Sequence, residues 1–192
     1  MLTAACGGSS LSSTTAPSTP TTLHAEVSDP VGDAVASPGV STPPDLVHGT
    51  VDVAGGNVTL TIQFAPGTLD RQTTRLTIEL DTDQNPATGN PAAGPLGIDY
   101  IVDMWARTNQ TIIQQATPTT CTSGGACYAQ VGTASVSVAG DSMTTTVALA
   151  VLGNASGRLN YRVGSYAYPQ STTPTAVADF MPDIRLPPAH VP

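Results

Sequence analysis

The sequence predicts an all-β protein, and three observations lead to that prediction. Apolar and polar residues alternate with period two in several short segments, as in strands that bury one face. The 18 glycines and 17 prolines in 192 residues leave little room for long helices. Turn-forming residues separate the alternating segments at regular spacing. Together these observations favour an antiparallel, jelly-roll-like β-sandwich of about eight or nine strands, with an up-and-down barrel as the alternative.

The clearest strand covers residues 57–64, where Val, Leu, Ile and Phe alternate with Asn, Thr and Gln. Gly55 and Gly56 precede it and predict a hairpin turn from a strand at 46–53. The remaining predicted strands are 75–80, 99–105, 111–115, 128–138, 142–149 and 159–168.

The chain divides into a polar arm, residues 1–23, and one domain, residues 24–192. Residues 7–23 are rich in Ser, Thr and Pro, so we expect a disordered stalk. Cys6 lies between Ala-Ala and Gly-Gly, which resembles the cleavage box of bacterial lipoproteins, although the charged and apolar parts of a signal peptide do not precede it. We therefore expect an exported protein, anchored to a membrane by lipid on Cys6, at the cell surface or in the periplasm.

Charge excludes several functions. The formal net charge is −8, and the six basic residues are all arginines. A chain without lysine has no P-loop lysine and no Schiff-base lysine, and scattered arginines do not form the basic patch that nucleic-acid binding needs. There is no Gly-x-Ser-x-Gly motif, and neither of the two glutamates, Glu26 and Glu79, is expected to have a raised pKa. The prediction is a non-catalytic protein that binds no nucleic acid.

Cys121 and Cys127 enclose the turn-forming sequence Thr-Ser-Gly-Gly-Ala. A turn of this kind brings two thiols within reach of each other, and export favours oxidation. We therefore predict a disulfide between them.

The segment 81–99 is the best candidate for chemistry. Asp81, Asp83 and Asn85 are spaced by two, and alternate oxygens in a tightly turning loop can converge on one hard cation. Thr88 and Asp99 are candidates to complete the ligand set. An EF-hand is excluded because a proline occupies its glycine position, so the prediction is a structural Ca²⁺ site of another kind. The alternative is that these residues only cap their own turns.

A second group of acidic residues comes from the two ends of the predicted domain. Asp29 and Asp33 open it, and Asp179 and Asp183 nearly close it. Because domain termini often lie close together, these side chains are candidates for a second site, with turn capping as the alternative. Asp45 is interpreted as the start of a strand.

Several motifs follow one another in order: Asp-Pro-x-Gly-Asp, Pro-Asp-Leu, Gly-Gly-Asn-Val-Thr-Leu-Thr-Ile, Leu-Asp-Thr-Asp-x-Asn-x-x-Thr-Gly and Gly-Ile-Asp-Tyr. This order resembles secreted bacterial β-sandwich domains related to the DOMON and family-nine carbohydrate-binding modules, over about residues 26–183. The resemblance implies a jelly-roll-like sandwich with structural Ca²⁺ and a binding role, often for sugars.

Trp105 is the candidate ligand-stacking residue because it shares a predicted strand face with Asp99 and Asp103. The alternative is a core tryptophan. The function predicted first is a lipid-anchored, Ca²⁺-stabilised binding or display module for a glycan or a cell-surface protein. A hydrolase or enzyme-accessory domain using Asp99, Asp103 or Asp83 is one alternative, and a structural subunit of an extracellular assembly is another.

Overall fold

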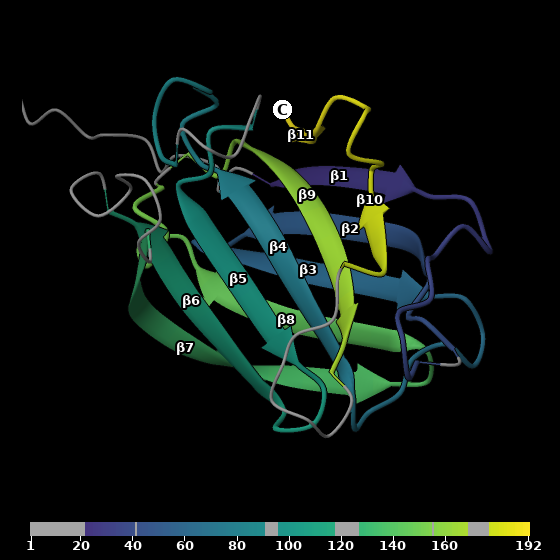
Figure 1. Ribbon diagram of the computed structural model, residues 1–192. Helices are drawn as coiled ribbons and strands as arrows, with labels where there is room; N and C mark the ends of the chain where they lie inside the picture. Colours follow the sequence, from purple (N-terminus) through teal and green to yellow (C-terminus); the bar gives the residue numbers. More distant parts are fainter. Residues whose placement is uncertain (1–21, 41, 91–95, 118–126, 155, 169–176) are drawn as a thin grey trace, which may run out of the picture.

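Alternating sequences form the strands in the computed structural model, which describes residues 22–40, 42–90, 96–117, 127–154, 156–168 and 177–192. These residues contain eleven strands and no α-helix, which confirms the all-β prediction (Figure 1). The strands are β1 (Leu23–Ser28), β2 (Leu46–Ala54), β3 (Asn57–Phe64), β4 (Thr74–Asp81), β5 (Tyr100–Trp105), β6 (Gln110–Ala116), β7 (Tyr128–Ala139), β8 (Ser142–Ala148), β9 (Leu159–Ala167), β10 (Asp179–Met181) and β11 (Ala189–Val191). In the described part of the chain, no helix is long and apolar enough to cross a membrane.

All strand pairs are antiparallel, in the order β1-β2-β3-β8-β7-β6-β5-β4-β9-β10, and β11 also pairs with β9. The strand β7 joins two halves of the sheet, because its first part pairs with β6 and its last part with β8. The sheet curls round until β10 lies against β2 and β11 against β1, so it is nearly closed into a barrel. We call the junction of β10 and β11 with β2 and β1, which no strand ladder bridges, the seam. The neighbours β3–β8 and β4–β9 are far apart in sequence, so the alternative of a simple up-and-down order is wrong.

The core fills the inside of this curved sheet. Apolar side chains at every second position of β3 and β4 point inward, with Leu60, Leu76 and Ile78 fully buried. Burying each such side chain contributes about 1.5–3 kcal/mol, so this interior supplies most of the driving force for folding.

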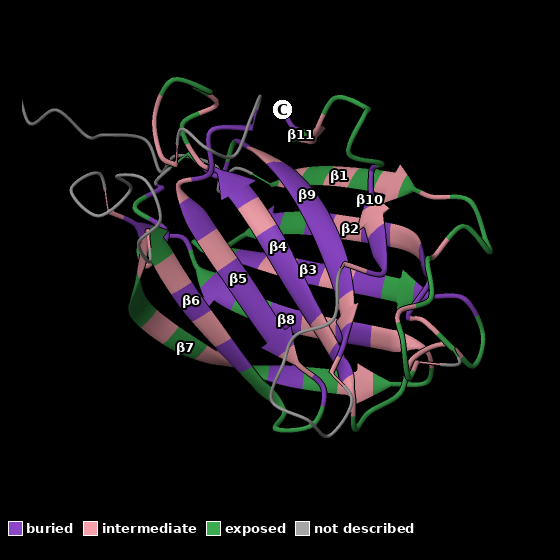
Figure 2. Ribbon diagram, viewed as in Figure 1, coloured by how far each residue is buried: buried purple, intermediate pink, exposed green. Residues whose placement is uncertain are grey.

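Burial is uneven across the sheet (Figure 2). The neighbouring strands β4 and β9 are covered on nearly their whole length, whereas β1 and β7 leave many side chains exposed. On β9 even Arg162 is buried, and its guanidinium donates to the carbonyl of Leu186, 3.2 Å away, in the connection between β10 and β11.

The expectation of eight or nine strands was too low. The structure adds β1, β10 and β11 at the chain ends, and two of them have only three residues, too few to show alternation. Cys6, Cys121 and residues 7–21 of the predicted stalk lie outside the described residues, whereas Leu23, the last residue of that stalk, begins β1. Cys127 is described, and its carbonyl accepts a hydrogen bond from Thr117 N–H at 2.8 Å, where β6 and β7 come together.

Candidate functional site

The ladder between β4 and β5 brings the acidic loop together. Leu80 pairs with Tyr100, so Asp81 and Asp99, which follow and precede these partners, lie at the same end of the two strands. Carboxylate oxygens of Asp81, Asp83 and Asp99 all lie within 4.8 Å of one another. We call these three residues the loop site; three of the five predicted ligands are therefore assembled here.

The other two predicted ligands shape the loop. The backbone N–H of Asn85 donates to Asp81 at 3.0 Å and to Asp83 at 2.9 Å. The hydroxyl of Thr88 donates to both carboxylate oxygens of Asp83 at 3.0 Å. Gly89 is required where the loop returns, because a Cβ there would lie 2.3 Å from the carbonyl oxygen of Ile98. These contacts are of the turn-capping kind, and they also hold the carboxylates in a fixed arrangement.

The electrostatics of the loop site favour a cation. Asp81 is fully buried, and burial raises its pKa, against the lowering effect of hydrogen bonds from Asn160 and Asn85. Burial likewise raises the pKa of Asp99, partly offset by donors of Thr82. None of the ion pairs formed by the described residues involves these carboxylates. An open pocket lined by Asp83, Asp99 and neighbouring residues gives solvent access.

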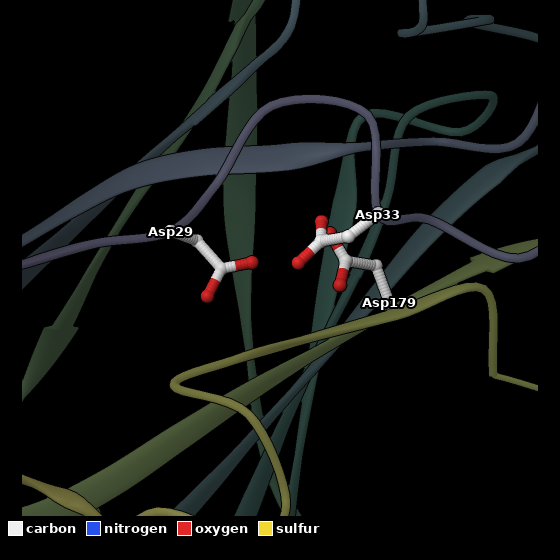
Figure 3. Close-up of side chains that lie close together, drawn as sticks. All are labelled: Asp29, Asp33 and Asp179. Carbon is white, nitrogen blue, oxygen red and sulfur yellow. The ribbon is translucent and has the colours of Figure 1, made fainter.

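The second predicted acidic group also forms, in part (Figure 3). Asp29, Asp33 and Asp179 point their carboxylates toward one another, with oxygens within 4.8 Å. Burial, followed by the charges of neighbouring carboxylates, raises the pKa of Asp29 to about 7. Burial is also the largest cause that raises the pKa of Asp179 to about 6. Asp183 is exposed and outside this group, although its charge contributes to the shift at Asp29.

Trp105 lies on the outer face of the sheet and is only half-buried, so the alternative of a core tryptophan is wrong. The guanidinium carbon of Arg75 lies 4.8 Å from the centroid of its ring, and the ring of Tyr168 lies 5.1 Å away. Asp103 pairs with Arg75 at 2.6 Å and accepts from the Thr77 hydroxyl at 2.8 Å.

Two further contacts complete this group. Tyr166 lies beside Arg75, 5.6 Å from ring centroid to guanidinium carbon, and Arg75 also donates to the Tyr168 hydroxyl. We call Trp105, Arg75, Asp103, Tyr166 and Tyr168 the aromatic face.

The structure separates one predicted neighbour from Trp105: Asp99 precedes β5, whereas Trp105 ends it. Sequence reasoning missed Arg75 and Tyr168. Period-two alternation places Arg75 on the outer face, but only the pairing of β4 with both β5 and β9 sets it between the aromatic rings.

The expectation that the pKa of Glu79 is not raised was wrong. Glu79 lies on the same outer face, opposite Arg162 in the ladder, and burial raises its pKa, an effect that the charge of Arg162 partly opposes. The covering of β9 by the chain's last segment creates this setting, so no local signal could reveal it.

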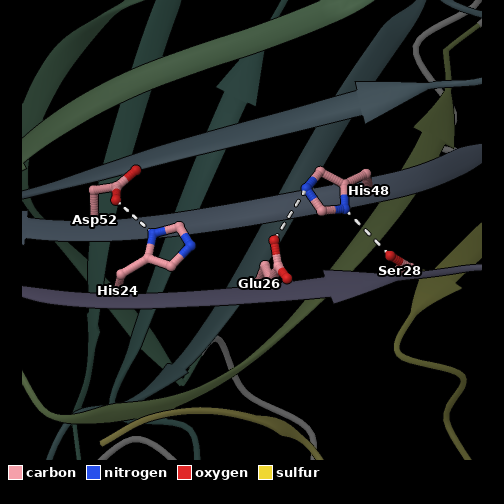
Figure 4. A network of polar contacts seen from close by, with 5 residues as sticks. All are labelled: His24, Glu26, Ser28, His48 and Asp52. Atoms are coloured by element: carbon pink, nitrogen blue, oxygen red, sulfur yellow. Dashed lines mark hydrogen bonds and ion pairs between the residues drawn. The ribbon is translucent and has the colours of Figure 1, made fainter.

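The histidines of β1 and β2 make surface contacts (Figure 4). His24 contacts Asp52 at 2.7 Å, and His48 lies 3.3 Å from the Ser28 hydroxyl. His48 is also 4.0 Å from Glu26, too far for the hydrogen bond that orients a catalytic histidine. The arrangement is that of exposed cross-strand polar pairs.

Comparison with protein-family models returns no match, and no curated protein matches the sequence.

Proposed function

We propose that this chain is a non-catalytic, Ca²⁺-stabilised binding module, exported and lipid-anchored through Cys6, whose aromatic face binds sugar-containing ligands. The observation that carries the proposal is the aromatic face: three aromatic rings and one Arg–Asp pair together on the outside of the sheet. Aromatic rings stack on the apolar side of a sugar, and charged groups beside them accept and donate hydrogen bonds to its hydroxyls.

The aspartates support a binding role over hydrolysis. Asp103 is engaged by both Arg75 and Thr77, and one oxygen of Asp99 accepts from the backbone and the hydroxyl of Thr82 at 2.9 and 3.0 Å. Donors hold one oxygen of each carboxylate in place, so neither group is free to turn toward a substrate as a general base.

The loop site supports the Ca²⁺ part of the proposal. Its oxygen spacing suits a hard cation, for which two ligands on opposite sides stand about 4.6–5.2 Å apart. The ordered motifs that resemble the DOMON and family-nine carbohydrate-binding modules support both the sugar class and a jelly-roll-like sandwich, of which the nearly closed sheet would be a variant. The context of Cys6 and the Ser/Thr/Pro-rich segment support the lipid anchor, and export supports the Cys121–Cys127 disulfide.

Binding to a panel of immobilised glycans tests the sugar proposal. Because the chain has one tryptophan, the fluorescence of Trp105 should shift on addition of the glycan that binds. We expect Trp105→Ala to weaken binding at least tenfold, about 1.4 kcal/mol. Tyr128→Ala, at the far end of β7, is the matched control and should bind normally. Absence of binding across the panel, or equal binding by Trp105→Ala, would contradict the sugar proposal.

The thermal midpoint in EDTA, and after addition of Ca²⁺ or Mg²⁺, tests the loop site. At a hundredfold excess over Kd a ligand of the folded state adds about 2.7 kcal/mol, a rise of several degrees. We expect a larger rise with Ca²⁺ than with Mg²⁺, and a smaller Ca²⁺ response in Asp83→Ala than in the wild type. An Asp83→Ala variant with the full wild-type response would argue that the loop carboxylates serve as turn caps.

A further inference from the structure

Asp45, which immediately precedes β2, has an unusual environment. Its side chain is 4% exposed, and one oxygen, Oδ2, accepts from the Gly32 N–H at 2.8 Å. The other oxygen, Oδ1, is buried with no hydrogen-bond partner in the described structure, and the same holds for Oδ2 of Asp29. Leaving a buried carboxylate oxygen unpaired is costly, so two such atoms in one region need a partner that the described residues do not supply.

Asp45 lies between the two parts of the second acidic group. Gly32, its donor, belongs to the loop that carries Asp29 and Asp33. The next residue, Leu46, donates its N–H to Asp179 at 2.7 Å. The charge of Asp45 is close enough to add to the effect of burial in raising the pKa of both Asp29 and Asp179. Asp29, one of the two residues with an orphaned oxygen, therefore belongs to the carboxylate group of Figure 3, and Asp45, the other, borders that group.

We propose that Asp29, Asp33, Asp45 and Asp179 bind one divalent cation, preferentially Ca²⁺, which fastens the first strands of the sheet to the last. We call these four residues the clasp site. Ca²⁺ takes six to eight oxygens at about 2.3–2.6 Å, so the oxygens of Asp29, Asp33 and Asp179, which lie within 4.8 Å of one another, fit around it. Asp45 borders these three residues through Gly32 and Leu46 and would supply the fourth carboxylate. The cation would give the orphaned oxygens of Asp45 and Asp29 their missing partner and neutralise carboxylates that otherwise repel one another.

The position of the clasp site gives the cation a structural role. Asp29 directly follows β1, Asp45 directly precedes β2, and Asp179 begins β10. β1 and β10 are the two ends of the paired strand order, and across the seam β10 contacts β2 and β11 contacts β1. A hydrogen bond from Val35 N–H to the Ala178 carbonyl, 2.7 Å, already holds the 29–40 segment beside β10. A cation would add a strong link at the same place.

The number of Ca²⁺ ions bound by the full chain, measured by equilibrium dialysis and titration calorimetry, tests the clasp site. The wild type should bind one ion at the clasp site and a second at the loop site. Asp45→Asn keeps an oxygen for Gly32 but removes the charge, and Asp33→Asn changes only an exposed residue with little risk to folding. Each should remove one ion, Asp81→Asn should remove the other, and Asp141→Asn, in the β7–β8 turn, should remove none.

Amide hydrogen exchange supplies a second readout. Ca²⁺ should slow exchange in β1 and β10 of the wild type and of Asp81→Asn, but not of Asp33→Asn. The clasp site is overturned when Asp33→Asn and Asp45→Asn both bind as many ions as the wild type, or when a single ion is bound and lost only in Asp81→Asn. A single ion lost in Asp33→Asn and retained in Asp81→Asn would support the clasp site and contradict the loop site.

Discussion

Tyr161, on β9, is fully buried, and its hydroxyl has no hydrogen-bond partner within the described residues. A buried unpaired hydroxyl has lost water without gaining a replacement bond. We therefore predict that Tyr161→Phe raises the free energy of unfolding by about 1 kcal/mol, as measured by chemical denaturation. Tyr128→Phe is the control: its hydroxyl accepts from Asn90 at 2.9 Å, so the same change there should not stabilise. If Tyr161→Phe lowered the free energy of unfolding as much as Tyr128→Phe, or more, the Tyr161 hydroxyl would have to be paired.

Tyr161 also makes the folding stability of the protein depend on pH at alkaline values. Burial, followed by the charge of Glu26, raises the pKa of Tyr161 from its usual 10 to about 12. Since the folded-state pKa lies above the unfolded one, the contribution of Tyr161 to stability is complete below pH 10 and is lost as the pH rises through 12. Between these values Tyr161→Phe should lose less stability than the wild type. If the free energies of unfolding of the two proteins fell equally across this pH range, the prediction would be refuted.

At the scale of elements, the point where β7 passes from β6 to β8 depends on two buried threonines. The hydroxyl of Thr111 on β6 donates to that of Thr145 on β8 at 2.9 Å, and Thr145 donates to the Ser135 carbonyl of β7 at 2.9 Å. Thr145→Val leaves the buried hydroxyl of Thr111 without its acceptor, and we expect a loss of about 1–3 kcal/mol in unfolding free energy. Adding Thr111→Val should recover part of this loss, because the orphaned donor is then removed. Additive losses in the double variant would mean that the two hydroxyls do not interact.

Local pattern predicted the strands well and their partners poorly. Alternation and the Gly55-Gly56 turn predicted the β2–β3 hairpin with nearly the observed bounds. The alternation of residues 23–28 was also present in the sequence, so β1 could have been found. The pairs β3–β8 and β4–β9 could not, because they depend on packing between segments far apart in the chain.

The candidate sites show the same division. Asp81, Asp83 and Asp99 were identifiable because loop spacing and one strand pair bring them together. Asp45 had no local signal: its burial depends on the loop at Gly32 and on β10, which is distant in the sequence. Trp105 was identifiable as a candidate, but its contacts with Arg75 and Tyr168 follow from the order of β5, β4 and β9.

For the whole molecule, the seam is where the sheet is held by side chains instead of a ladder. Met181 of β10 is fully buried and reaches across to Gly49 of β2. The approach is so close that a Cβ at Gly49 would lie 2.6 Å from the Met181 methyl carbon. We predict that Met181→Ala lowers the free energy of unfolding by about 2–5 kcal/mol and speeds amide exchange in β1 and β2 ahead of global unfolding.

Met143→Ala is the matched control, since Met143 is equally buried but belongs to β8, which is paired on both sides by β3 and β7. It should cost a similar amount without singling out β1 and β2, because the ladder around it stays intact. If Met181→Ala and Met143→Ala raised exchange in the same strands, the sheet would unfold as one unit and the seam would have no separate stability. Ca²⁺ at the clasp site should then protect all strands equally, so the two experiments together decide whether closure of the sheet is a distinct step.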